Sequence, residues 1–325
     1  MQMDAPPNAD SFHHSAAEST STRLDLLVTD IAKQLGCTDL PPTLDGHCEL
    51  LLDGNRSLSI WPRPEVSGLV LVADLAVADD VYLEGAYRTA LGYCLGAASI
   101  GAPVIGKNEE GSLVLLWTMG SQGGSEIAAD GISIFLENLE LADTMLAGKS
   151  VEEEAVHTES SEDEVVAPSE AVLEALAEAL QLEKIELGED GFGTFQMGNG
   201  SLVLMQYSQA QRRIALLAQV STLTEGAEEE LCMKALEYNY VAASDGEPVM
   251  GLDTERGGLF LITTLGAQDS AATEVEPVLE LFLNRYAKCL GIVYDPDYEE
   301  QLEDEAEAEA EQQQPDEMPF GGIRV

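Results

Sequence analysis

Few residues of this chain are spaced for catalysis or metal binding. The segment at residues 101–107, GAPVIGK, imitates the start of a phosphate-binding loop, but Asn108 stands where coordination of Mg²⁺ requires Ser or Thr. The histidines are scattered, which provides neither a metal cluster nor a base beside a nucleophile; they are His13, His14, His47 and His157. We therefore expect a protein that is not an enzyme and that has no cofactor and no metal ion.

The acidic residues are the most abundant chemical groups of the chain. Sixty Asp and Glu residues face 15 Lys and Arg residues, which gives a formal net charge of −45. Such a field repels nucleic acids and anionic membranes, so neither is expected as a partner. The acidic runs also lack the Gly-centred Asp-x-Asp-x-Asp spacing of a Ca²⁺ loop. Solvation and the exclusion of wrong partners are therefore the expected roles of this charge.

Three features of the composition favour a cytoplasmic protein. The N-terminal segment, MQMDAPPNADSFHHSAAES, has neither the basic region nor the apolar core of a signal peptide. The five cysteines are odd in number and form no Cys-x-x-Cys pair, which is typical of buried, reduced thiols. The richest apolar run, at residues 69–78, is interrupted by Asp74 and is too short to span a membrane.

Biased composition divides the chain into five parts. Residues 149–168 are acidic and contain Ser, Thr and Pro, so we expect a linker there. Residues 1–20 are expected to be disordered, as is the acidic tail at residues 295–325, which ends in the octamer MPFGGIRV. Two blocks remain, at residues 21–148 and 169–294, and each is long enough to form a domain.

These two blocks are copies of each other, shifted by about 145 residues, a spacing that we call the repeat offset. Residues 97–106 (AASIGAPVIG) and 242–251 (AASDGEPVMG) share seven identities in ten positions. Further matches are GNRSLSI at 54–60 with GNGSLVL at 198–204, and SLVLLWTMG at 112–120 with GLFLITTLG at 258–266. The chain therefore contains a tandem duplication.

Each copy has the same order of predicted elements. Apolar residues at helical spacing predict three helices per copy, around residues 24–35, 83–94 and 132–139 in the first copy and 172–180, 231–240 and 275–286 in the second. Short β-rich runs separated by Gly, Asn, Pro and Arg predict three strands after the first helix and a hairpin after the second. The predicted fold is α+β, with the order α-β-β-β-α-β-β-α twice and one antiparallel sheet per copy.

This order, size and acidity, with three segments of the second copy, resembles the class I type III secretion chaperones, the Tir chaperone family. The segments are ALEYNYVAAS (235–244), EPVMGLDTERGGLFLITTL (247–265) and GFGTFQMGNGSLVL (191–204). The specific elements include Asn239 near the end of the second helix and Gly-Leu-Asp at 251–253. The first copy departs from them, since Tyr93 and Cys94 lie near the place of Asn239 and Gly-Lys-Asn stands at 106–108.

The resemblance implies a small acidic bacterial protein that acts as a dimer. Family members hold the N-terminal chaperone-binding segment of a secreted effector in an extended form without ATP, and they self-associate through the second helix and the strand after it. A duplicated chain is then expected to be a monomer that forms an intramolecular pseudo-dimer. Its interface candidates are Val104, Ile105, Val249 and Met250.

The apolar residues of the second predicted strand are the candidates for client binding. They are Leu58, Ile60 and Trp61 in the first copy and their counterparts Leu202, Leu204 and Met205 in the second. Alternation puts Leu58 and Ile60 on one face and Trp61 on the other, and the sequence favours a place in the core for the first two. Two prolines flank Trp61, which favours an edge strand beside which a client strand could add.

The C-terminal octamer is a second candidate for recognition. Its apolar residues follow a segment of about twenty residues that is rich in Asp and Glu, which is the layout of a tethered recognition motif; they are Met318, Phe320, Ile323 and Val325. The motif could dock over an empty client groove, address the secretion apparatus or have no role.

Two functions fit the sequence. The first is a non-enzymatic secretion chaperone that binds the N-terminal segment of one or more effectors and keeps it export-competent. The alternative is a regulatory adaptor of the same fold that sequesters a transcription or secretion regulator. Fold alone does not separate them.

Overall fold

The computed structural model describes the two copies as two packed halves. The described residues are 48–52, 56–63, 68–76, 83–120, 124–149, 167–188, 190–197, 200–224 and 226–294. The helix predicted near residues 24–35 and the whole C-terminal motif lie outside these residues. Within them, no helix combines the length and the apolar character that a membrane span requires.

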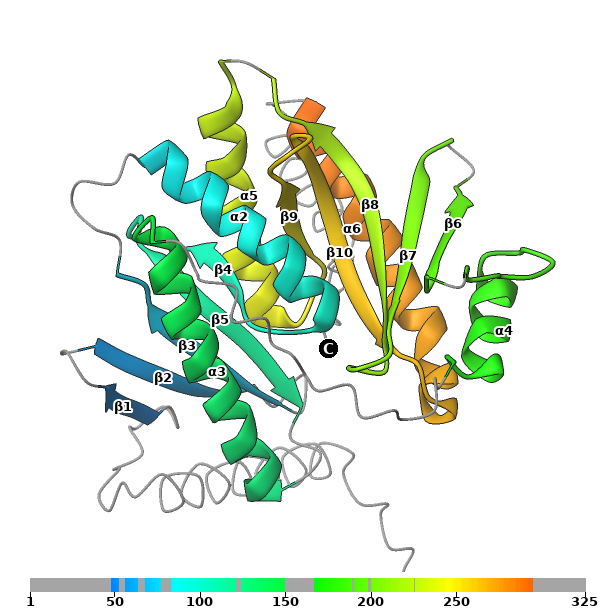
Figure 1. The fold of residues 1–325 in the computed structure, drawn as a ribbon, viewed down its shortest axis with the longest axis horizontal. Coiled ribbons are helices and arrows are strands. Elements are labelled where there is room, and N and C mark those ends of the chain that lie inside the picture. The colour runs from blue at the N-terminus through cyan, green and yellow to red at the C-terminus, as the bar shows by residue number, and fades with distance from the viewer. Residues whose placement is uncertain are drawn as a thin grey trace, which may run out of the picture.

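The described part of the first half is one antiparallel sheet with two helices. The strands follow the order β1-β2-β3-β5-β4, so β1 and β4 lie at the two edges (Figure 1). The elements are β1 (Cys48–Leu52), β2 (Arg56–Arg63), β3 (Gly68–Asp74), α2 (Leu83–Ile100), β4 (Val104–Lys107), β5 (Leu113–Gly120) and α3 (Gly124–Leu146).

The second half repeats this arrangement and shows the first helix as well. Its strands follow the order β6-β7-β8-β10-β9, with β6 and β9 at the edges. The elements are α4 (Glu170–Ala179), β6 (Phe192–Gln196), β7 (Leu202–Ser208), β8 (Arg213–Thr222), α5 (Glu228–Asp245), β9 (Val249–Asp253), β10 (Gly258–Gly266), a 3-10 helix (Asp269–Glu274) and α6 (Val275–Tyr294). The predicted α+β fold with two antiparallel sheets is confirmed.

Local sequence signals explain where the helices of the second half begin and end. The Ser169 hydroxyl accepts a hydrogen bond from the N–H of Ala171 (3.2 Å), so Ser169 is the N-cap of α4. Helix α5 ends at Gly246, whose φ of 71° lies in the left-handed region that glycine tolerates. Its apolar side faces the core through Cys232, Leu236 and other buried residues.

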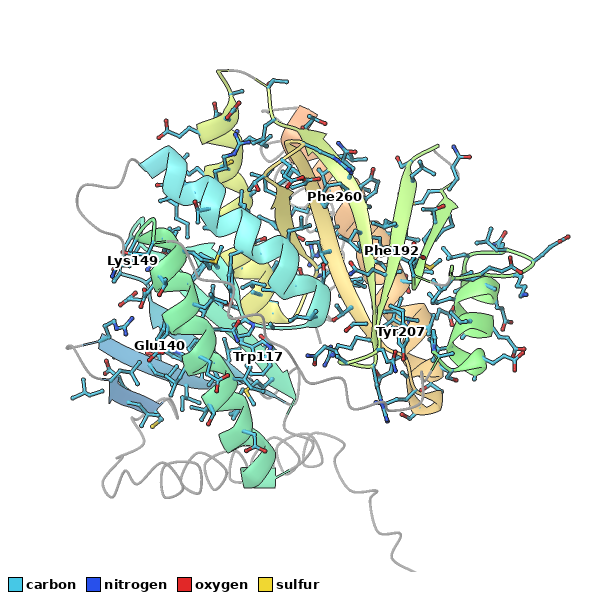
Figure 2. All side chains as sticks on the ribbon, viewed as in Figure 1. Trp117, Glu140, Lys149, Phe192, Tyr207 and Phe260 are labelled. Carbon is cyan, nitrogen blue, oxygen red and sulfur yellow. The ribbon has the colours of Figure 1, made fainter. Side chains whose placement is uncertain are left out.

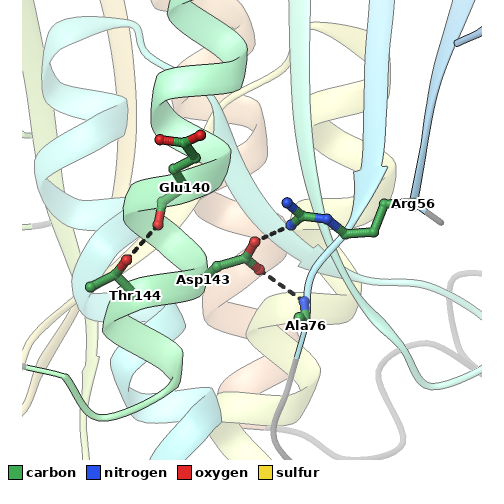
Figure 3. Close-up of polar contacts among 5 residues, drawn as sticks. All are labelled: Arg56, Ala76, Glu140, Asp143 and Thr144. Atoms are coloured by element: carbon green, nitrogen blue, oxygen red, sulfur yellow. Dashed lines mark hydrogen bonds and ion pairs between the residues drawn. The ribbon is translucent and has the colours of Figure 1, made fainter. Parts of the chain in front are cut away.

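In the first half, Asp143 connects α3 to the sheet (Figure 3). One oxygen of its carboxylate accepts a hydrogen bond from the backbone N–H of Ala76 (2.9 Å), just after β3, and the other pairs with the guanidinium of Arg56 on β2. Thr144, the next residue, donates to the carbonyl of Glu140 within the same helix. Asp143 therefore fixes the C-terminal part of α3 against two strands.

The two halves pack through their second helices and the strands that follow them. Helix α2 lies against β9 and β10 of the second half, α5 lies against β4 and β5 of the first, and α2 also contacts α5 (Figure 1). We call this region, made of α2, β4, α5 and β9, the central interface. Buried residues from both halves form one continuous core across it.

The strand pairings give the structural correspondence between the copies. Leu58 pairs with Ala73, and Val203 pairs with Ala218, so Leu58 corresponds to Val203 by the repeat offset. The match of 54–60 with 198–204, which aligned Leu58 with Leu202, is therefore wrong by a single position. In a strand, such a slip moves every side chain to the other face of the sheet. This slip changes which residues of β7 can face a partner.

Candidate functional site

The edge strands β4 and β9 meet one buried polar side chain at the central interface. Asn239 on α5 accepts a hydrogen bond from the N–H of Met250 (2.6 Å) and donates to the carbonyl of Met250 (2.8 Å). Its amide also donates to the carbonyl of Ile105 in the other half (3.3 Å). Asn239 is fully buried. One amide therefore satisfies both backbone polar groups of Met250 on β9 and bridges to β4.

Cys94 occupies the place in the first half that corresponds to Asn239 by the repeat offset. Its thiol donates to the carbonyl of Ile105 (3.4 Å) and accepts from the N–H of Ile105 (3.2 Å). The Asn239 amide lies 3.7 Å from this sulfur, so the two side chains face each other across the interface. Burial raises the pKa of the Cys94 thiol from 9.0 to about 12. The thiol is neutral at physiological pH and acts as a structural group.

Two glycines allow the strands and helices of opposite halves to approach closely. A Cβ added at Gly106 on β4 would lie 2.7 Å from the backbone N and Cα of Tyr240 on α5. A Cβ at Gly251 on β9 would lie 2.6 Å from the same two atoms of Leu95 on α2. The repeat offset relates the two glycines and likewise their two partners, so the contacts are equivalent.

The interface candidates from the sequence lie on these two strands. Val104 and Ile105 are buried on β4, and Val249 and Met250 are buried on β9. Ile105 and Met250 are the residues whose backbone groups meet Cys94 and Asn239.

A cavity of about 510 Å³ lies beside the central interface, between the two sheets. From the first half it is lined by Val104, Trp117 and Ile134, and from the second by Arg213, Val249 and Ile262. The Trp117 indole donates to the carbonyl of Gly101 (3.0 Å), and Figure 2 shows it on β5 beside α3. The lining mixes apolar side chains with threonines, Arg213 and two carboxylates, which suits a segment that carries both apolar and polar side chains.

A second hollow, of about 400 Å³, lies in the second half between α4, β6 and α6. We call it the outer groove. Its lining is apolar apart from Gln181, Gln196 and the Tyr286 hydroxyl, which donates to the carbonyl of Gln219 (3.0 Å). The apolar residues include Leu180, Leu182, Phe195, Met197, Leu283 and Leu290.

The groove is bounded by β6, which has a strand neighbour on one side only in the part of the chain that is described. The backbone groups of Phe192 that point away from β7 are bonded locally, its carbonyl to the N–H of Gly188 (2.7 Å) and its N–H to Asp190. Because these directions alternate along a strand, Thr194 and Gln196 present their N–H and C=O groups on the same outer side. Such an edge can accept an added strand.

Exposed apolar side chains lie on the face of this sheet opposite the outer groove. Phe192 is 40% exposed and Leu202 is 63% exposed, while Leu204 between them is half-buried. We call these three residues the outer-face patch. Figure 2 labels Phe192 and Tyr207 on the two outermost strands, β6 and β7. Helix α2 contacts β8, β9 and β10 of this sheet, whereas the patch lies on β6 and β7.

Several of the client-binding candidates are core residues. Leu58 (0% exposed) and Ile60 (1%) face the core of the first half, and Met205 (1%) faces that of the second. Met205 corresponds to Ile60, because both pair with a leucine at the same place in the next strand. Leu202 and Leu204 have the opposite orientation, so of the predicted counterparts only these two reach the surface.

Trp61 is exposed but does not lie on an edge strand. It is 42% exposed, and β2 runs between β1 and β3 in the sheet, so the expectation of an edge was wrong. Its counterpart in the second half is Gln206. On this face of β2 the first half has Ser57 and Ser59, where the second half has Leu202 and Leu204. The leucine pair of the outer-face patch is therefore not repeated at these positions in the first half, where the exposed apolar residues of the same face are Leu51 and Trp61.

Sequence reasoning missed Phe192 and the outer groove. Phe192, Thr194 and Gln196 share one face of the strand because successive side chains alternate. An apolar residue beside two polar ones on such a face was a usable signal of an exposed apolar side chain. The groove combines residues of α4, β6 and α6 that are far apart in the sequence, and no local pattern marks it.

Several ionisable groups near these surfaces have raised pKa values. Burial raises the pKa of Tyr93 and of Tyr238, which donate to Asn138 (2.8 Å) and to the carbonyl of Pro248 (3.0 Å). Burial also raises the pKa of Cys289 to about 12. The hydrogen bond to Glu247 raises the pKa of Arg285. At neutral pH these groups keep their ordinary protonation states, which suits a binding surface.

The fold consists of two copies of one α+β domain. The family model of the Tir chaperone protein (CesT) family matches residues 26–128 and 171–288. The chain belongs to this family and carries its domain in tandem, as the sequence resemblance indicated.

Solved structures with a similar fold include three complexes. A chain of the HopA1-SchA chaperone-effector complex is 14% identical with a TM-score of 0.31, over 37% of this chain and 90% of that one. A chain of the ExsC-ExsE complex is 22% identical with a TM-score of 0.35, over 39% and 95%. A chain of the complex of the Yersinia pestis type III secretion chaperone SycH with a stable fragment of YscM2 is 21% identical with a TM-score of 0.28, over 37% and 97%. No curated protein sequence matches the chain.

Proposed function

We propose that this chain is a non-enzymatic type III secretion chaperone that binds the N-terminal segment of a secreted effector in the bacterial cytoplasm and keeps it extended. The observation that carries this proposal is the open edge of β6, which lies between two apolar surfaces of the second half. An extended segment that paired with this edge would place alternate side chains in the outer groove and over the outer-face patch.

Charge would act at the rim of this site. Glu183, Glu186 and Asp190 lie in the segment that leads into β6, and the Lys184 ammonium at 2.7 Å lowers the pKa of the exposed Glu186 carboxyl. Carboxylates here favour a segment with basic residues and speed its encounter, while the apolar contacts supply most of the affinity. Binding should therefore persist at moderate salt.

We further propose that the chain acts as a monomer whose two halves replace the two subunits of a dimer. The support is the central interface, where the contacts of Gly106 and Gly251 are repeated by the two halves. In this arrangement Val104, Ile105, Val249 and Met250 belong to the buried strands that join the halves.

The test is a pair of substitutions with a matched control. Leu202→Asp and Phe192→Asp place a charge in the outer-face patch, whereas Leu51→Asp changes an 84%-exposed leucine at the edge of the first half. The effector is first identified as the protein that stays bound to the tagged chain from its source cells at moderate salt without ATP. Its N-terminal segment is then titrated against each variant.

We expect each patch variant to weaken binding at least about tenfold, and Leu51→Asp to leave it unchanged. Equal affinity of the parent and both patch variants would refute this site. Retention of a transcription or secretion regulator in place of an effector would favour the regulatory adaptor.

A further inference from the structure

The central interface contains two ion pairs that are not repeated by the two halves. The guanidinium of Arg88 on α2 donates to the carboxylate of Glu228 (3.1 Å) and to the carbonyl of Thr254 (2.9 Å). The ammonium of Lys107 on β4 pairs with the carboxylate of Glu237 on α5 (2.6 Å). Both cations come from the first half and both carboxylates from the second.

The positions that correspond to these four residues carry no charge. By the repeat offset, Leu83 and Met233 correspond to Glu228 and Arg88. In the same way Gly92 and Leu252 correspond to Glu237 and Lys107, and the carbonyl of Leu252 lies 4.0 Å from a Cβ built at Gly92. Each half therefore makes the glycine contact with the other half. The ion pairs form only between cations of the first half and carboxylates of the second.

This asymmetry penalises pairing of like halves. Two first halves would place Lys107 against Gly92, and its side chain, which is only 13% exposed here, would lose its carboxylate. Two second halves would place Glu237 against Leu252. A charge that is removed from water without a partner is costly, so the pair of first halves carries the larger penalty. The pair of second halves, in which Glu237 is 45% exposed, is disfavoured because it lacks both ion pairs of the unlike pair.

The residues that face each other at the centre have also diverged. Cys94 and Asn239 hold the same place in their halves, and the Asn239 amide reaches the carbonyl of Ile105 across the interface. A pair of first halves would lose this cross-interface hydrogen bond, since a thiol that donates to its own strand has no second donor.

We propose that the central interface is specific for unlike halves, and that the ion pairs Arg88–Glu228 and Lys107–Glu237 set this specificity. The partner of each half is the other half of the same chain, because the covalent linkage raises its effective concentration above that of other chains. This inference concerns assembly and stands whichever client the chain binds.

The test uses two full-length charge-reversed chains. Chain X carries Arg88→Glu and Lys107→Glu, and chain Y carries Glu228→Lys and Glu237→Lys. Within either chain the two halves then meet with like charges. In a mixture, the first half of X matches the second half of Y, and the first half of Y matches the second half of X. A third chain carries all four substitutions, so that its ion pairs are restored in reverse.

The readout is native mass spectrometry after mixing or co-expression. We expect a 1:1 complex of X and Y at twice the 34.8 kDa mass of the chain, with association at least about tenfold tighter than X with X or Y with Y. The four-substitution chain should be monomeric like the parent. A control chain with Lys184→Glu and Glu186→Lys, an exposed pair within the second half, should also stay monomeric.

Some outcomes would overturn the proposal. Monomeric X and Y with parental stability and no mixed complex would show that the ion pairs do not select the partner. A four-substitution chain that is less stable than X and Y would show the same. If X and Y fold only when they are co-expressed, and are then recovered together, the proposal is supported.

Discussion

Replacing Asn239 should destabilise both halves of the molecule together. In Asn239→Ala the N–H and the carbonyl of Met250 lose their side-chain partner, while the carbonyl of Ile105 retains the thiol of Cys94. An unsatisfied buried polar group costs about 1–3 kcal/mol. Two such groups lower the free energy of unfolding by about 2–6 kcal/mol. Water that enters the space of the lost amide would reduce this loss. We expect a loss of about 3 kcal/mol.

The assay exploits the position of the two tryptophans. Trp61 and Trp117 are both in the first half, whereas Asn239 is in the second. Urea unfolding followed by tryptophan fluorescence therefore reports on the half that is not mutated, and far-UV circular dichroism reports on both. If the central interface joins the halves into one cooperative unit, the two signals shift to lower urea together.

Asn138→Ala is the matched control. Asn138 is half-buried on α3, accepts from Tyr93 and donates to a helical carbonyl, so its loss should cost about 1 kcal/mol or less. A tryptophan transition that Asn239→Ala leaves in place would refute the coupling of the halves. A loss no larger than that of the control would refute the role given to the buried amide.

Three other perturbations test single contacts. Gly106→Ala should lower the free energy of unfolding by about 1–3 kcal/mol through the clash with Tyr240, whereas Gly96→Ala, with nothing within 4 Å on α2, should raise it by about 1 kcal/mol; urea midpoints distinguish them. For Cys94, the pKa of 9.0 rises to about 12 on folding, so its contribution is complete below pH 9 and is lost as the pH rises toward 12. Cys94→Ala should flatten this alkaline loss, and an unchanged slope would contradict it. Asp143→Ala should cost about 1–2 kcal/mol in thermal unfolding and Thr144→Ala close to nothing, and equal effects would contradict the role of Asp143.

The duplication and the element order could be predicted because they rest on local signals. The periodicity around residues 83–94 and 231–240 corresponds to α2 and α5, which have the same length and are related by the repeat offset. Apolar repeats of this kind report which side of an element is buried, whatever the rest of the fold. The same reasoning identified the strands of the two hairpins.

The candidate surface was harder to predict because it depends on distant elements. Sequence similarity around the Gly-Asn turns aligned Leu58 with Leu202. The strand pairings show instead that Leu58, which pairs with Ala73, corresponds to Val203, which pairs with Ala218, so Leu58 and Leu202 face opposite sides of their sheets. Which side of β7 stays open depends on how far α2 of the other half extends over the sheet. The sequence marked Asn239 and Cys94 as a difference between the copies, and their shared place became evident only in three dimensions.

The most direct test of the account is the stoichiometry of the chain with its client. Native mass spectrometry of the complex, purified without ATP from the source cells, should show one chain bound to one effector. Deletion of the effector's N-terminal segment or the Leu202→Asp substitution should abolish this species. Two chains per effector, or a complex that survives both changes, would contradict a pseudo-dimer that binds its client at the outer strands of the second half.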